Sequence, residues 1–165
     1  MTRRPPSRLL LALALLPGAG AAARAQDASG AALATGVLQA SLAVSGLRSL
    51  DFGRITPTMT VVVPPTSAAA GQFLVQAAAG SSVGLVLTLP TSLGTDLAVG
   101  AWTGRTNVVN DATTGALAFA PASGATLRRT VGSTGTLYVF LGATLTATGA
   151  APGSYSRPIV LNVAY

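Results

Sequence analysis

Neither lysine nor glutamate occurs anywhere in this 165-residue chain, and that gap limits what the chain can fold into. Both residues favour the surfaces of helices. Charged residues of all kinds make up 8% of the sequence, against about 25% in typical soluble proteins. In their place stand threonine, valine, glycine, serine and alanine, a mixture of strand formers and turn formers. The composition therefore predicts an all-β domain.

The first 25 residues have the pattern of a secretory signal peptide. Three arginines within residues 1–8 precede an uninterrupted Leu/Ala run at 9–16, and Ala23-Arg24-Ala25 supplies the small residues that signal peptidase needs. The apolar run is shorter than the roughly 20 residues of a transmembrane helix. We therefore predict export to the periplasm, cell surface or medium, with cleavage after Ala25 and no membrane insertion afterwards.

What remains after the signal peptide is long enough for one domain. We divide it into a weakly patterned, flexible arm at 26–36 and a β-sandwich domain at 37–165. Four of the ten arginines belong to the signal peptide, so six remain against four aspartates, and a net charge of +2 gives no support for nucleic-acid binding. Cysteine is absent, so packing and not disulfides must hold the fold.

Alternating apolar residues predict seven to nine short strands with Gly, Pro or Asn-Asp turns between them. The expected strands cover 38–52 with a kink or bulge near Gly46, 58–63, 73–77, 83–89, 97–101, 117–119, 127–131, 136–148 and 153–165. A short Ala-Gly-Ser turn separates 73–77 from 83–89, which predicts a hairpin. The polar run 105–115 predicts a long connection. With no helical period, the pattern favours an antiparallel β-sandwich.

Most of the side chains that carry enzyme chemistry are missing, since the chain has no His, Cys, Lys or Glu. A serine without His or Lys lacks its usual base. The four aspartates, at 27, 51, 96 and 111, are spread along the chain without a metal-binding spacing. We therefore predict a non-enzymatic protein with no catalytic residue, no cofactor and no metal. A hydrolase built on a folded pair of these aspartates is the weakest alternative.

Three segments of the chain resemble a family of secreted bacterial proteins. They are LDFGRI at 50–55, LYVFLGATLTAT at 137–148 and APGSYSRPIVLNVAY at 151–165. The family is a domain of unknown function close to spore coat protein U and to chaperone-usher pilins. It has a similar early LDFG, a late VGATLTV-like strand and a terminus that ends in tyrosine. The similarity spans about residues 37–165.

The resemblance implies an immunoglobulin-like sandwich that lacks its final strand, as in pilins. A periplasmic chaperone and then the arm of a neighbouring subunit would fill the gap by adding a strand to an open sheet edge. The residues that fall into this scheme are an assembly edge of Ile159, Leu161, Val163 and Tyr165 and, within 28–36, a donor arm of Ala31, Leu33 and Thr35. The implied function is a fimbria-like or surface structural subunit in a homo- or hetero-polymer.

An alternative interpretation is a secreted binding or adhesion module. It would fold as a complete monomeric sandwich and recognise carbohydrate or another surface ligand through loops such as 103–115. Trp102 and Tyr138 could contribute to a sugar-stacking surface, although core packing is the commoner role of a lone tryptophan in a small sandwich.

Overall fold

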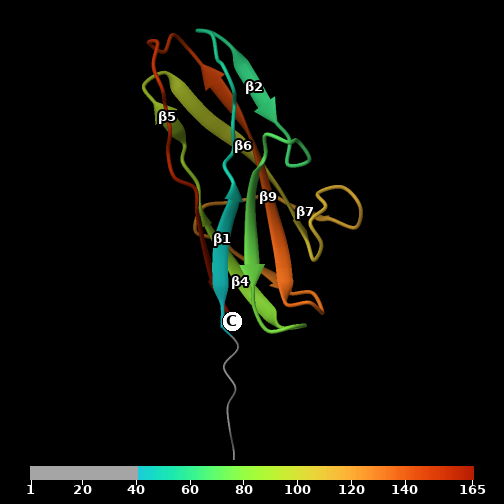
Figure 1. Cartoon of the computed structure of the whole chain (residues 1–165). Helices are drawn as coiled ribbons and strands as arrows, with labels where there is room; N and C mark the ends of the chain where they lie inside the picture. The colour runs from blue at the N-terminus through green and yellow to red at the C-terminus, as the bar shows by residue number, and fades with distance from the viewer. Residues whose placement is uncertain (1–40) are drawn as a thin grey trace, which may run out of the picture. The chain divides into compact units, whose positions relative to one another are not determined.

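The computed structural model describes residues 41–165, and this part of the chain consists of ten β-strands without a helix (Figure 1). The strands are β1 (Ala43–Arg48), β2 (Thr60–Val63), β3 (Gly71–Gln76), β4 (Ser82–Thr88), β5 (Ser92–Gly94), β6 (Leu97–Asn107), β7 (Leu117–Phe119), β8 (Thr126–Thr130), β9 (Thr136–Ala147) and β10 (Val160–Ala164). The predicted all-β fold is confirmed. Within residues 41–165, nothing helical is long and apolar enough to cross a membrane.

The strands form two antiparallel sheets, an arrangement consistent with a β-sandwich. The larger sheet has the order β1-β3-β9-β6-β5, with β2 paired to the second half of β9 and β7 paired to β6. The smaller sheet has the order β10-β4-β8. Because β1 and β10 each pair with one strand only, both are edge strands of the described domain.

The main core cluster contains buried side chains from both sheets. Its fully covered members include Val75, Val83, Leu85, Leu137, Val139 and Leu141. Alternate residues of β3, β4 and β9 supply these side chains, so the inner faces of the two sheets pack against each other. Leu161 of β10 belongs to the same cluster, which anchors the C-terminal strand to the sandwich.

A second core cluster lies along the second half of β9, and its buried members all come from the larger sheet. They are Leu97, Val99, Ala143, Leu145 and Ala147. Strand β9 has 12 residues, whereas β4, the longest strand of the smaller sheet, has seven. At about 3.3 Å per residue, the larger sheet extends about 16 Å further. The smaller sheet is therefore too short to cover this end, and connecting segments cover it instead.

The predicted hairpin between β3 and β4 is wrong, because the two strands belong to different sheets. The link between them contains a turn in which Ser81 N–H donates to Ala78 O at 3.1 Å, and it also bonds to a distant segment: Ala77 N–H donates to Gly135 O at 3.0 Å and Gly80 N–H to Gly132 O at 3.3 Å. Both glycine acceptors lie in the β8–β9 turn, so the link crosses from one sheet to the other. Apolar alternation alone cannot distinguish paired strands from facing strands, since both present one face to the core.

Other boundaries also differ from the sequence expectations. The bulge predicted near Gly46 is present, as a register shift between Gly46 and Arg48 of β1. The chain is not a strand over residues 49–52, where the first strand was expected to continue. The strand predicted over 153–165 begins only at Val160, because Pro152 and Pro158 lack the backbone donor that a sheet ladder needs.

One lateral side of the sandwich is closed by contacts between the sheets. Arg129 of β8 donates its Nε–H to Thr106 Oγ1 at 2.9 Å, and its guanidinium lies 5.9 Å from the centre of the Phe119 ring. Ser123 accepts a hydrogen bond from Leu89 N–H at 2.8 Å, which ties the β7–β8 connection to the smaller sheet. This side leaves only a cavity of about 400 Å³. Arg128, the neighbour of Arg129, is exposed.

Candidate functional site: an open groove beside the second core cluster

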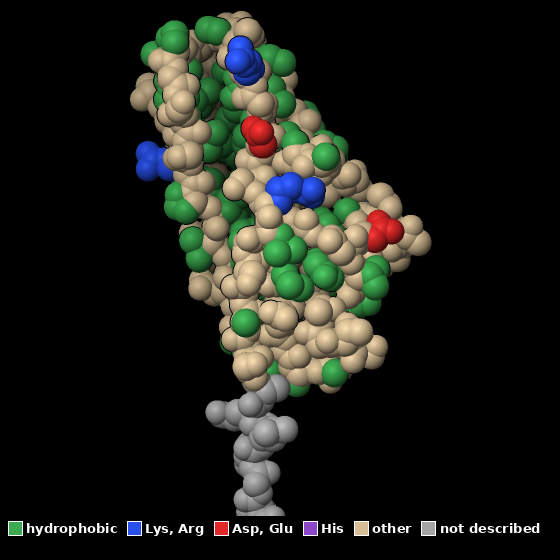
Figure 2. All heavy atoms as spheres, in the orientation of Figure 1, with side chains coloured by type: hydrophobic (Ala, Val, Ile, Leu, Met, Phe, Trp, Pro, Cys, Tyr) green, Lys and Arg blue, Asp and Glu red, His purple; other side chains and the backbone are tan. Residues whose placement is uncertain are grey.

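An apolar groove of about 1100 Å³ opens where the smaller sheet ends. Its two rims are chain segments 46–57, which lead from β1 towards β2, and 150–159, which lead from β9 towards β10. Figure 2 shows a hollow in the upper part of the molecule, with hydrophobic side chains inside it. In Figure 1 the two rim segments run along opposite sides of that end of the larger sheet.

The floor of the groove is apolar, whereas its two rims also carry serine, threonine, arginine and aspartate side chains. Buried Leu97 and Val99 form part of the floor. The half-buried side chains around them are Leu50, Phe52, Ile55, Leu93, Trp102 and Ile159. Trp102 contacts both core clusters and also lines the groove, so it is neither a fully buried core residue nor a surface platform. A partner that covered these side chains would remove apolar surface from water, at about 25 cal/mol per Å².

Beyond Arg48, where β1 ends, neither rim belongs to a sheet. The first rim leaves the sheet after the β1 bulge and turns at Asp51, whose Oδ1 accepts a hydrogen bond from Gly53 N–H at 2.8 Å, with Gly53 at a φ of 68°. The second rim is exposed throughout residues 151–158. Its backbone groups at 152–158 make no backbone hydrogen bond with the rest of the described chain. The groove is therefore bordered by an extended segment whose donors and acceptors are available to an added strand.

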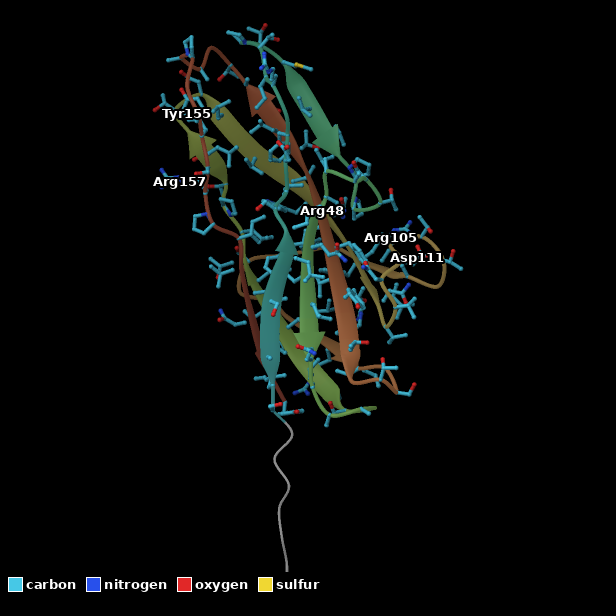
Figure 3. All side chains as sticks on the ribbon, viewed as in Figure 1. Arg48, Arg105, Asp111, Tyr155 and Arg157 are labelled. Atoms are coloured by element: carbon cyan, nitrogen blue, oxygen red, sulfur yellow. The ribbon has the colours of Figure 1, made fainter. Side chains whose placement is uncertain are left out.

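Tyr155 fixes the second rim against the larger sheet (Figure 3). Its ring lies directly on Gly94 of β5, where a Cβ atom would come within 2.8 Å of the ring. Its hydroxyl donates a hydrogen bond to Ala151 O at 2.7 Å. Gly94 is thus needed for this close approach, and the rim holds its position although it is not a strand.

The residues assigned to the assembly edge have different surroundings. Ile159 lines the groove. Leu161 is buried in the main core cluster, and Val163 packs against that cluster. Tyr165 is 56% exposed, and its hydroxyl accepts a hydrogen bond from Ala78 N–H at 3.2 Å. The groove thus lies before β10 rather than along it. The donor-arm residues Ala31, Leu33 and Thr35 lie outside the described residues.

Sequence reasoning missed the first rim as part of the site. Leu50, Phe52 and Ile55 belong to the LDFGRI segment, which we interpreted as the end of the first strand. The available signal was their spacing, which departs from strict alternation after Phe52 and places Gly53 in a turn. Apolar side chains on a turn segment need cover from elsewhere, and here the cover is incomplete.

A second feature of the domain is a well-ordered loop between β6 and β7, within the segment 103–115 that the binding-module interpretation uses. Asn107 Nδ2 donates to Asp111 O at 2.6 Å and to Thr114 O at 2.9 Å. Arg105 of β6 donates from Nη1 to Ala112 O at 3.1 Å, and Figure 3 shows Arg105 near Asp111, which lies in the loop. The loop exposes two apolar side chains, Val108 at 41% and Val109 at 55%.

The same loop lowers the pKa of Asp111 from 3.8 to about 2. The first cause is the Thr113 hydroxyl, which donates to Oδ1 at 2.6 Å, followed by the Thr113 backbone N–H at 2.7 Å. A lowered pKa means that the ionised carboxylate stabilises the folded loop above pH 3.8, and that this contribution is lost as the pH falls towards about 2.

We expect an NMR titration of the Asp111 carboxyl carbon to show a midpoint near pH 2. In Thr113→Val, which keeps the backbone donor but removes the hydroxyl, the midpoint should move up towards 3.8. A midpoint of 3.8 in both proteins would show that these hydrogen bonds do not form in solution.

The aspartates of the described residues lie apart from one another. Within 41–165 no group of three or more acidic, His or Cys side chains comes together that could hold a metal ion. Asp51 and Asp111 each accept hydrogen bonds from their own turn.

Comparisons with known proteins add no relative from which a family could be assigned. No family model matches the chain, and neither a curated protein nor a solved structure matches it significantly. The groove and its rims are therefore the evidence on which a function must be argued.

Proposed function

We propose that this protein is a non-enzymatic, fimbria-like or surface structural subunit that assembles by strand addition into the groove. One observation carries the proposal: a groove with an apolar floor lies where the larger sheet extends beyond the smaller one, and residues 152–158 of one rim make no backbone hydrogen bond within the described chain. An inserted strand would pair with such an edge and cover the half-buried side chains, which is how strand addition gains both affinity and specificity.

The resemblance of LDFGRI, LYVFLGATLTAT and the tyrosine-ended terminus to the spore coat U and pilin families supports the same proposal. On this interpretation the domain is an immunoglobulin-like sandwich without its final strand, exported by the signal peptide at 1–25. A chaperone covers the groove until a neighbouring subunit supplies residues 28–36, including Ala31, Leu33 and Thr35. Because donor and acceptor are different surfaces, the contact repeats head to tail and yields a fibre.

Deletion of residues 26–36 tests the proposal. The mature chain should form oligomers whose size grows with protein concentration, whereas the shortened chain should sediment as a monomer with an unchanged β-type circular dichroism spectrum. Analytical ultracentrifugation over a hundredfold concentration range makes the comparison. Identical sedimentation of both proteins, whether monomeric or assembled, would contradict the proposal.

The second candidate function is a monomeric binding or adhesion module, favoured by the rigid β6–β7 loop that exposes Val108 and Val109. Its recognition surface would be this loop, not the groove. One double variant distinguishes the two functions. If the protein is a binding module, Val108→Ser combined with Val109→Ser should abolish binding to a carbohydrate or cell surface. If it is a structural subunit, the same variant should assemble through the groove unchanged.

A further inference from the structure

The rims of the groove carry more positive than negative charge. Three arginines and one aspartate line it, namely Arg48, Arg54, Arg157 and Asp51. Arg48 is engaged, since its Nε–H donates to Ala70 O at 2.8 Å. Figure 3 shows Arg157 on the rim that also carries Tyr155, and Figure 2 shows charged side chains on both sides of the hollow.

Arg54 and Arg157 differ from Arg48 in having no partner among the described residues. Both side chains are exposed, and within residues 41–165 neither guanidinium makes a hydrogen bond or an ion pair. Each lies on a different rim, and Figure 3 shows the Arg157 side chain on the outer side of its rim, so a strand inserted between the rims lies in the combined positive potential of the two guanidiniums. An inserted carboxylate would be attracted, and an inserted lysine or arginine would be repelled.

The arm of this chain carries a suitable carboxylate. Asp27 comes directly before residues 28–36 and is the only charged side chain between 26 and 40. The 15 residues of 26–40 span at most about 50 Å when extended, enough to reach into a groove of another molecule.

The geometry favours the groove of a second copy over the chain's own groove. Leu42 packs against the main core cluster, next to the start of β1. Strands β1 and β10 are in contact with each other, whereas the groove lining begins at Gly46. The chain's own arm would therefore have to reverse before Leu42 and cross the β1–β10 contact to reach the groove.

We infer that Arg54 and Arg157 form a charge filter that selects an acidic inserted strand, and that its partner is Asp27 in the arm of a second copy of this chain. This inference rests on the proposed function, because it requires a strand in the groove. It adds a specificity that apolar contacts cannot provide: the small side chains of the arm fit many grooves, whereas the charge on the rims rejects basic strands.

Charge reversal on the mature full-length chain tests the filter. Sedimentation gives the protein concentration at half-association. The measurement is made at about pH 9, because a free α-amino group, with a reference pKa of about 7.7–8.0, is then largely neutral while arginine stays charged. We expect R54E/R157E to raise that concentration about tenfold at low salt, and less at about 0.5 M salt, where the Debye length is short. Asp27→Arg alone should weaken association similarly.

The decisive variant combines all three changes. R54E/R157E/D27R restores opposite charges and should return to within about threefold of the unsubstituted chain. Arg128→Glu is the matched control, because Arg128 is exposed on β8 and does not line the groove. Association of R54E/R157E equal to that of R128E, or no recovery in the triple variant, would overturn the inference. An unsubstituted chain that stays monomeric at every concentration would instead overturn the proposed function.

Discussion

Gly142→Val is expected to destabilise the domain by at least about 3 kcal/mol, a large part of the 5–15 kcal/mol that holds a typical domain folded. Gly142 is buried in the middle of β9. A Cβ atom there would lie 2.7 Å from Pro65 N and 2.8 Å from Pro64 C, and closer still to Val63 O. All three are backbone atoms and cannot rotate away, so β2 and the segment after it would have to move off β9.

Thermal unfolding followed by circular dichroism measures this effect, and the midpoint should fall by about 10 °C or more. Gly100→Ala is the matched control. Gly100 of β6 pairs with Thr144 of β9, and a Cβ atom at Gly100 would meet nothing within 4 Å. A Gly142→Val midpoint within about 2 °C of the Gly100→Ala midpoint would show that β2 does not lie against β9 as the structure has it.

The long central strands could be predicted because their residues restrict the alternatives locally. TLYVFLGATLTA is the longest apolar stretch of the domain and is rich in β-branched and aromatic residues, and Pro64 and Pro65 end β2 where the sequence places them. Such signals act over a few residues, and packing did not override them.

The site could not be predicted to the same extent, since it depends on which strands face each other. The sequence indicates Ile159 as an assembly residue, and the structure places it in the groove. The predicted strands at 83–89 and 136–148 already differ in length, but the sequence gives no sign that these two strands face each other across the core. That arrangement is what leaves Leu97 and Val99 without a facing strand. The mismatch is a property of two distant segments, so only the folded domain reveals it.

The loop at 103–115 shows the same limit for polar residues. A turn at Asn110-Asp111 was predictable from residue type. Its packing was not: Asn110 Oδ1 accepts a hydrogen bond from Gln72 Nε2 at 2.5 Å, across 38 residues of sequence. This contact lies on the outer face of the larger sheet beside Phe140, which pairs with Gln72 in register and is only 3% exposed.

Ile159→Asp is expected to weaken assembly at least about a hundredfold, because an inserted strand would enclose the new carboxylate in an apolar groove, at a cost of several kcal/mol. Val160→Asp is the matched control on the adjacent residue: Val160 is 42% exposed and does not line the groove.

Since Ile159 also packs against the main core, Ile159→Ala serves as the milder variant, folded but weaker in assembly by about tenfold. Sedimentation measures assembly, and circular dichroism confirms that each variant is folded. If folded Ile159→Asp and Val160→Asp assembled with equal affinity, the groove would not be the acceptor, because only one of the two carboxylates lies where the added strand must bind.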